Sequence, residues 1–79
     1  MSADAKLVEL VQAQVLTYCS IADVRLTEDL FDLGIQSLDL MSICSALAAQ
    51  IGVNIEMLDV IGDPSITGIA RVLAEKLDG

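Results

Sequence analysis

Residues 32–51 of the chain read DLGIQSLDLMSICSALAAQI. From residue 37 onward the apolar side chains recur at the i, i+3, i+4, i+7, i+11 spacing that places them on one face of a helix. These side chains are Leu40, Ile43, Cys44, Leu47 and Ile51. Gly52 follows the last of them and is a residue that commonly ends a helix. The pattern therefore predicts a helix from Ser37 to Ile51 with one buried stripe.

Similar stripes predict one helix before this segment and one after it. The first runs from Asp4 to Tyr18 and would bury Leu7, Leu10, Val11, Val15 and Tyr18. The last opens at Asp63-Pro64-Ser65, with the proline in its first turn and Asp63 or Ser65 as the N-cap. It would bury Ile66, Ile69, Ala70, Leu73 and Leu77.

The two connections between these helices have different characters. Residues 53–61 are short and mixed, which favours one or two helical turns. Residues 19–36 have no clear period but are too apolar for a solvated linker, and a loop of this length in a small domain usually has a function. We expect it to pack over the helices, with a short helical turn capped by Thr27. The sequence thus predicts an all-α fold, a small four-helix bundle with three longer helices and one short helix, in a single domain of residues 1–79.

The amino-acid composition and net charge of the chain argue against several classes of function. Hydrophobic residues make up 54% of the chain and aromatic residues 3%, which favours helices packed through aliphatic side chains. A formal net charge of -8 repels phosphate backbones and anionic membrane surfaces, so we expect no nucleic acid and no membrane partner. The chain has no apolar run long enough for a membrane span and no signal-peptide pattern at its start. We expect a cytoplasmic protein whose Cys19 and Cys44 are buried and reduced.

The residue inventory argues against an enzyme. The chain has no histidine, and neither cysteine has a basic neighbour in the sequence that would favour its thiolate form. The spacing of the acidic residues does not match an EF-hand calcium loop. We therefore expect neither a catalytic site nor a metal site.

One segment has a more specific pattern. Residues Asp32-Leu33-Gly34-Ile35-Gln36-Ser37-Leu38-Asp39-Leu40 resemble the attachment motif of acyl and peptidyl carrier proteins. That motif has Asp, an apolar residue, Gly, two variable residues, Ser, Leu and then often Asp or Glu, and every fixed position is met here. The resemblance covers nearly the whole chain, including the long apolar loop and the late Pro64-Ser65-Ile66. It implies a 4′-phosphopantetheine arm, taken from coenzyme A, on Ser37, with Asp32, Gly34, Leu38 and Asp39 completing the motif.

Physical chemistry agrees with this role for Ser37. Gly34 allows a sharp turn before the helix. A serine at a helix N-terminus presents its hydroxyl beside unpaired backbone N–H groups and the positive end of the helix dipole, which favour a phosphodiester. The simpler interpretation of Ser37 is a plain N-cap, and the two roles are compatible.

The resemblance also implies how the protein works and with which partners. It is a non-catalytic carrier, acting in trans, that tethers cargo as a thioester. Its partners are a phosphopantetheinyl transferase, an acyl-loading enzyme, and a ketosynthase or other acyl-processing enzymes. We expect a free-standing monomer, although a domain excised from a larger synthase is also compatible with the sequence.

Two further apolar residues near Ser37 suggest where partners dock. Leu38 and Met41 are not needed for the core stripe, and ordinary exposure is the simpler explanation for them. As a patch beside Ser37 they would form half of a partner-docking face, and residues 56–61, including Ile61, would form the other half. A cleft between these halves, lined by Leu47 and Val60, would shelter an apolar cargo.

The pathway is less determined than the carrier role. In fatty-acid-synthase carriers the second helix is rich in Glu, whereas here Asp39 is followed by Ser42, Ser45, Ala48, Ala49 and Gln50. Electrostatic docking should therefore be weaker, which favours a specialised pathway, polyketide-like or nonribosomal. We expect acyl cargo of the polyketide or fatty-acid type, with a peptidyl or aminoacyl carrier as the alternative. A helical interaction module without a prosthetic group is the alternative from another class.

Overall fold

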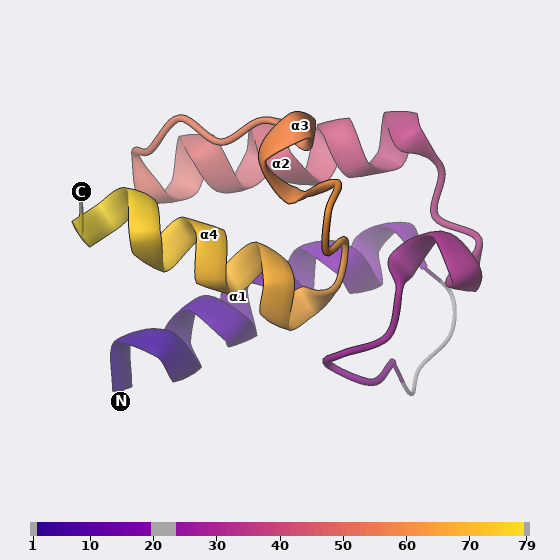
Figure 1. Ribbon diagram of the computed structural model, residues 1–79, viewed down its shortest axis with the longest axis horizontal. Helices are drawn as coiled ribbons and strands as arrows, with labels where there is room; N and C mark the ends of the chain where they lie inside the picture. Colours follow the sequence, from indigo (N-terminus) through magenta and orange to yellow (C-terminus); the bar gives the residue numbers. More distant parts are fainter. Residues whose placement is uncertain (1, 20–23, 79) are drawn as a thin grey trace.

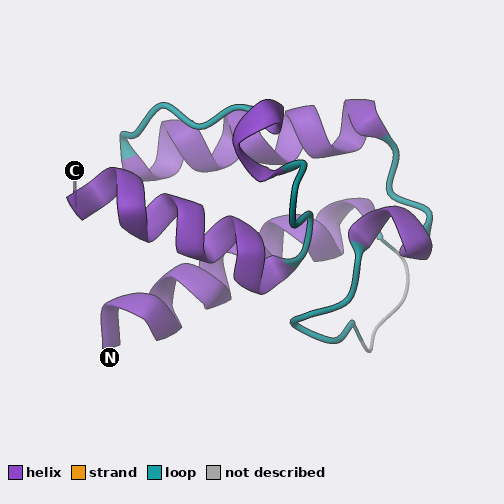
Figure 2. Cartoon of the chain, in the orientation of Figure 1, coloured by secondary structure: helices purple, strands orange, loops and turns teal. Residues whose placement is uncertain are grey.

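The computed structural model describes residues 2–19 and 24–78 (Figure 1). Its elements are α1 (Ser2–Tyr18), the 3-10 helix η1 (Leu30–Leu33), α2 (Ser37–Ile51), α3 (Met57–Val60) and α4 (Ile66–Asp78). Helices joined by loops make up the whole of this described part (Figure 2). The predicted all-α bundle, with three longer helices and one short helix, is confirmed.

The three longer helices pack around a shared aliphatic core. α1 contacts both α4 and α2, and α3 lies beside α2 and also contacts α4 (Figure 1). Each of the four α-helices contributes buried side chains, among them Val11, Leu40, Val60 and Leu73. No aromatic side chain among the described residues is fully buried, because Tyr18 is exposed and Phe31 is half-buried. The core therefore depends on close packing of Leu, Ile and Val, as the composition predicts.

The boundaries of α2 match the prediction, and those of the other helices differ slightly. α1 begins at Ser2 and not at Asp4. Its predicted core residue Tyr18 is 41% exposed, and Leu77 of α4 is 53% exposed. Both residues lie in the last turn of their helix, where the apolar stripe continues in sequence but the side chains are at the surface. Both were wrong as core predictions.

A single serine caps α4. The Ser65 side chain is buried, and its hydroxyl accepts a hydrogen bond from the Gly68 N–H at 3.0 Å and donates one to Asp63 Oδ1 at 3.0 Å. Ser65 thus satisfies one of the backbone donors that a helix start leaves unpaired. The cap is Ser65 and not Asp63, and Pro64 precedes the helix instead of lying in its first turn.

Two backbone hydrogen bonds join the long first loop to the start of α4. The Leu30 N–H donates to the Pro64 carbonyl at 2.8 Å, and the Thr67 N–H donates to the Leu26 carbonyl at 3.0 Å. Val24 and Leu30 are buried, so the loop packs on the core as predicted. Its residues 20–23 lie outside the described part.

The helical turn predicted in the loop is present as η1, but its cap differs from the prediction. Asp29, and not Thr27, is the cap: its Oδ1 accepts a hydrogen bond from the Phe31 N–H at 2.8 Å. A carboxylate accepts such a bond more strongly than a hydroxyl does, and it also complements the positive end of the helix. The sequence signal for Asp29 was equally available, since it directly precedes the apolar residues of the turn.

Two other properties follow from the described residues. Cys19 and Cys44 are both buried and free, so their predicted burial is confirmed. None of the helices in residues 2–19 and 24–78 combines the length and apolar character needed to cross a membrane.

Candidate functional site

Ser37 is the first residue of α2, and its side chain is exposed. Two buried residues fix the backbone on either side of it. Ile35, just before the helix, is 3% exposed, and Leu40, in the first helical turn, is fully buried. Ser37 is therefore held at the surface by anchors in the core, which gives its hydroxyl a defined position that remains open to a partner.

The approach of the chain to Ser37 depends on Gly34. Gly34 ends η1 with a φ of 95°, in the left-handed region that L side chains rarely adopt. Its N–H donates to the Phe31 carbonyl at 3.1 Å, and the Ile35 N–H donates to the Leu30 carbonyl at 3.1 Å. These bonds close η1 and turn the chain towards α2. Because Leu30 is itself bonded to Pro64, the site is connected to the start of α4.

The Ser37 hydroxyl does not cap α2, because another residue is the N-cap of this helix. The N-cap is Gln36, whose backbone is extended. The Asp39 Oδ2 atom accepts a hydrogen bond from the Gln36 N–H at 3.1 Å. The interpretation of Ser37 as a plain N-cap is therefore wrong: the serine lies one residue inside the helix. The backbone N–H groups of the first turn, including those of Ser37 and Leu38, have no acceptor one turn earlier in the helix.

The other motif residues differ in their roles. Asp39 is half-buried and stabilises the start of α2, whereas Asp32 lies in η1 with an exposed side chain. No lysine or arginine occurs anywhere between Arg25 and Arg71, so η1, α2 and α3 contain no basic side chain. These three elements therefore offer a phosphate on Ser37 no positive charge beyond the N-terminus of α2.

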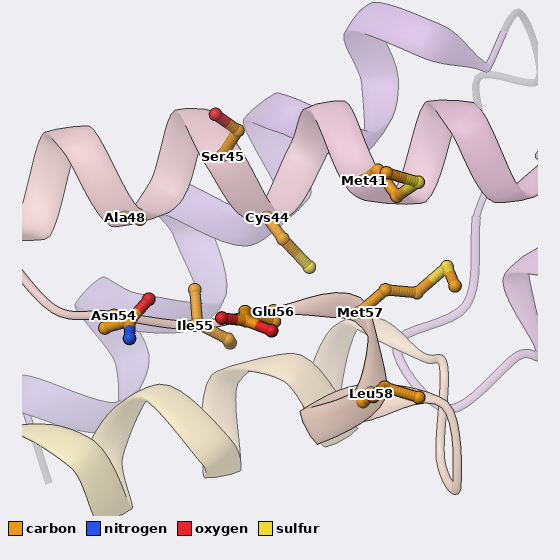
Figure 3. Close-up of a pocket in the computed structure, with 9 residues that line it drawn as sticks. All are labelled: Met41, Cys44, Ser45, Ala48, Asn54, Ile55, Glu56, Met57 and Leu58. Atoms are coloured by element: carbon orange, nitrogen blue, oxygen red, sulfur yellow. The ribbon is translucent and has the colours of Figure 1, made fainter.

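A cleft of about 490 Å³ lies between α2 and the segment that leads into α3 (Figure 3). Met41, Cys44 and Ala48 line it from α2, and Ile55 and Met57 are among the residues that line it from the other side. Ser37, Met41, Cys44 and Ala48 follow the i, i+4, i+7, i+11 spacing of one helix face. The attachment serine and the cleft therefore share a face of α2.

The position of the predicted cleft is confirmed, but its predicted lining is not. Leu47 is fully buried and Val60 is 1% exposed, so both belong to the core beneath the cleft. The lining consists of Met41, Cys44, Ser45, Ala48, Asn54, Ile55, Glu56, Met57 and Leu58. Sequence periodicity marks which residues are most buried. Of that stripe Cys44 lines the cleft, and the other α2 residues of its wall, Met41, Ser45 and Ala48, lie next to the stripe.

Cys44 points from α2 into the cleft in Figure 3. Burial, together with the negative charge of Asp59, raises the pKa of this thiol to about 11. The thiol is therefore neutral at physiological pH, and its reactivity as a nucleophile is low. Cys44 contributes to the cleft as a small apolar side chain.

The apolar residues assigned to docking are all at the surface. Leu38 is 72% exposed, Met41 is 50% exposed and Ile61 is 46% exposed. Leu58 in α3 is 77% exposed and was not among the predicted docking residues. A signal for it existed: four of the five residues from 57 to 61 are apolar, and one short helix cannot bury them all.

Comparison with known proteins supplies independent information on the chain. A family model described as a phosphopantetheine attachment site matches residues 5–73. This match spans α1, η1, α2, α3 and most of α4. No curated protein and no solved structure is significantly similar to the chain.

Proposed function

Because the chain belongs to the family of phosphopantetheine-attachment domains, which includes acyl and peptidyl carrier proteins, we propose that Ser37 is the residue that bears the arm. Membership makes the protein a carrier of covalently bound 4′-phosphopantetheine. We further propose that its cargo is an acyl intermediate of the polyketide or fatty-acid type, presented in trans to partner biosynthetic enzymes.

The position of Ser37 carries the proposal. Of the three serines in α2, Ser37 alone stands at the helix start, while Ser42 and Ser45 lie further along the helix. Among these three serines of α2, Ser37 alone combines an exposed hydroxyl with the unpaired N–H groups of a first turn. A serine whose hydroxyl were the cap of its own helix would be less available for modification.

The residues around Ser37 fit a phosphodiester on its oxygen. The N-terminus of a fifteen-residue helix offers backbone N–H donors and the positive end of a dipole. Asp39 already accepts the Gln36 N–H, so its carboxylate is held in a hydrogen bond instead of projecting freely at the phosphate. When bound, the arm supplies a terminal thiol that holds cargo as a thioester.

The protein itself contributes tethering and presentation. Carriers of this family are generally non-catalytic, and a separate phosphopantetheinyl transferase would supply the base and metal for modification of Ser37. A flexible arm on a small domain raises the effective concentration of its cargo at each docked active site. Weak docking then allows transfer to the next enzyme.

The cleft beside α2 favours acyl cargo over aminoacyl cargo. Met41, Ile55 and Met57 give its walls apolar surface, and such surface stabilises a hydrocarbon chain more than a charged ammonium group. A peptidyl or aminoacyl carrier remains the second candidate, because the attachment motif is shared by both kinds.

Intact-protein mass spectrometry tests the site. The protein is incubated with coenzyme A, magnesium and a broad-specificity phosphopantetheinyl transferase, together with Ser37→Ala and the matched controls Ser42→Ala and Ser45→Ala. We expect one phosphopantetheine on the wild type and on both controls, and none on Ser37→Ala. No gain in the folded wild type would instead support a helical interaction module without a prosthetic group.

A second experiment tests the cargo. The modified carrier is offered a malonyl-transferring enzyme with malonyl coenzyme A, or an adenylation domain with amino acids and ATP. Loading of the malonyl group and not of any amino acid is the expected result. Loading by adenylation domains alone would assign the protein to nonribosomal peptide synthesis.

A further inference from the structure

Most acidic side chains near the site are already used within the protein. Asp29 caps η1, and Asp39 accepts the Gln36 N–H at the start of α2. At the start of α3, Asp59 accepts the Glu56 N–H at 2.9 Å and pairs with Lys76 of α4 at 3.5 Å. Asp63 pairs with Arg71 at 3.4 Å. A partner that bound through these carboxylates would have to compete with contacts that stabilise helix ends and hold α3 against α4.

Two acids between residues 29 and 63 form no ion pair with a basic side chain of the described residues and cap no helix through a hydrogen bond to another segment. These are Asp32 in η1 and Glu56 before α3, and both are exposed. They leave little free charge for docking, since exposed ion pairs contribute only about 0–1 kcal/mol each.

The apolar side chains near the site are, by contrast, largely exposed. Leu38 and Met41 are three residues apart on α2, and Leu58 and Ile61 are three residues apart at α3. Met41 and Leu58 line the same cleft, which joins the two pairs into one surface. Leu58 and Leu38, at 77% and 72%, are the most exposed of the large apolar residues in the described part. We call Leu38, Met41, Leu58 and Ile61 the apolar docking surface.

The transferase that acts on Ser37 is the partner whose position is most constrained. Ser37 is adjacent to Leu38, so an enzyme that reaches its hydroxyl must cover this end of the apolar docking surface. The face of the enzyme that covers this end needs an apolar depression that accepts the Leu38 and Met41 side chains. It also needs one or two cations at its edge, opposite Asp32 and Glu56.

We propose that the phosphopantetheinyl transferase binds this carrier mainly through the apolar docking surface, with Leu58 as a principal contact, and that its binding tolerates high salt. The proposal rests on the carrier function argued above and specifies how that function selects its partner. Removing exposed apolar area from water is not screened by ions, whereas attraction between exposed charges is.

The test measures how KM of the transferase for the apo-carrier depends on salt and on the apolar side chains. Ionic strength is raised from about 0.1 M to about 1 M, which shortens the Debye length from about 10 Å to about 3 Å. Wild type is compared with Leu58→Ser, with the double variant Asp32→Asn/Glu56→Gln, and with Leu77→Ser. Leu77 provides a matched control because it is an exposed leucine on α4, outside the apolar docking surface. Circular dichroism confirms that each variant is folded.

The expected results are specific to each variant. KM for Leu58→Ser rises about fivefold or more, equivalent to about 1 kcal/mol, while KM for Leu77→Ser stays at the wild-type value. Salt and the double charge variant each change KM by less than about threefold, equivalent to about 0.7 kcal/mol. Two results would overturn the proposal. One is a change in KM with salt that is larger than the change in KM caused by Leu58→Ser, and the other is equal KM values for Leu58→Ser and Leu77→Ser. Either result is distinct from failure of the carrier function, which would show as no modification of wild type at any salt concentration.

Discussion

Replacing Ser65 by alanine should destabilise the whole domain, although the change removes one oxygen atom. The hydroxyl caps α4 through the Gly68 N–H and also donates to Asp63, and the residue is 1% exposed, so water cannot replace it easily. Loss of an N-cap costs about 1 kcal/mol. The lost hydrogen bond to Asp63 adds about 1 kcal/mol, and not more, because that exposed carboxylate can be rehydrated.

The expected total is about 2 kcal/mol, which lowers Tm by roughly 8–16 °C for a domain of this size. Urea and thermal unfolding followed by circular dichroism measure it. Ser42→Ala is the control: Ser42 is exposed on α2, and its removal should change stability by no more than about 0.5 kcal/mol. If Ser65→Ala and Ser42→Ala unfold at the same urea concentration, the cap does not hold the junction as described.

Three other changes test separate parts of the structure. Gly68→Ala would place a Cβ atom 2.7 Å from the Asp63 Cγ atom and against the Asp63 backbone oxygen. It should therefore lower the free energy of unfolding by about 1–3 kcal/mol in urea titrations, whereas a stabilised variant would refute the close approach. The hydrogen bond from the Glu56 N–H, and then the positive charge of Lys76 in α4, lower the pKa of Asp59. The ionised carboxylate of Asp59 therefore stabilises the folded protein at pH values above the usual carboxyl pKa, and this stabilisation is lost as the pH falls through the lowered pKa. Asp59→Asn should thus be less stable than wild type at neutral pH, with the gap closing in acid; a gap that is constant with pH would contradict this. Because the pKa of Cys44 is raised from 9.0 to about 11, wild type should lose stability relative to Cys44→Ala as the pH rises through that interval, and parallel pH curves would argue against it.

The helix pattern predicted the centre of the fold well and its ends less well. For α2 the bounds and the buried positions Leu40, Ile43 and Leu47 agree with the structure. Ile51, at the end of the same predicted stripe, is only half-buried. Tyr18 and Leu77 continue such a stripe but are exposed. Burial at a helix end depends on how far the adjacent helix extends, which periodicity does not contain.

The sequence predicted that side chains cap the helix starts, but it did not identify which residue supplies each cap. The sequence offers several residues that can cap a helix at each junction, and the choice between Asp63 and Ser65 depends on which side chain reaches the Gly68 N–H. At α2 the cap is Gln36, a residue that is not among the preferred cap types. Asp39 explains this exception, since it accepts the Gln36 N–H and so provides part of the capping from inside the helix.

The candidate site was predicted to the extent that its residues are neighbours in the sequence. Asp32, Gly34, Ser37 and Asp39 are within one turn or loop of each other, so a motif can identify them together. The cleft and the contribution of Leu58 depend on where residues 53–61 pack against α2. That packing is a tertiary contact, and local sequence patterns carry little information on it.

Peptide-level mass spectrometry of the modified protein tests the central claim most directly. After reaction with coenzyme A and the transferase, the protein is digested, and fragmentation of the α2 peptide locates the added group among Ser37, Ser42 and Ser45. We predict that all of the phosphopantetheine is on Ser37. Attachment to Ser42, to Ser45 or to a residue outside this peptide would contradict the account of how α2 presents its first serine.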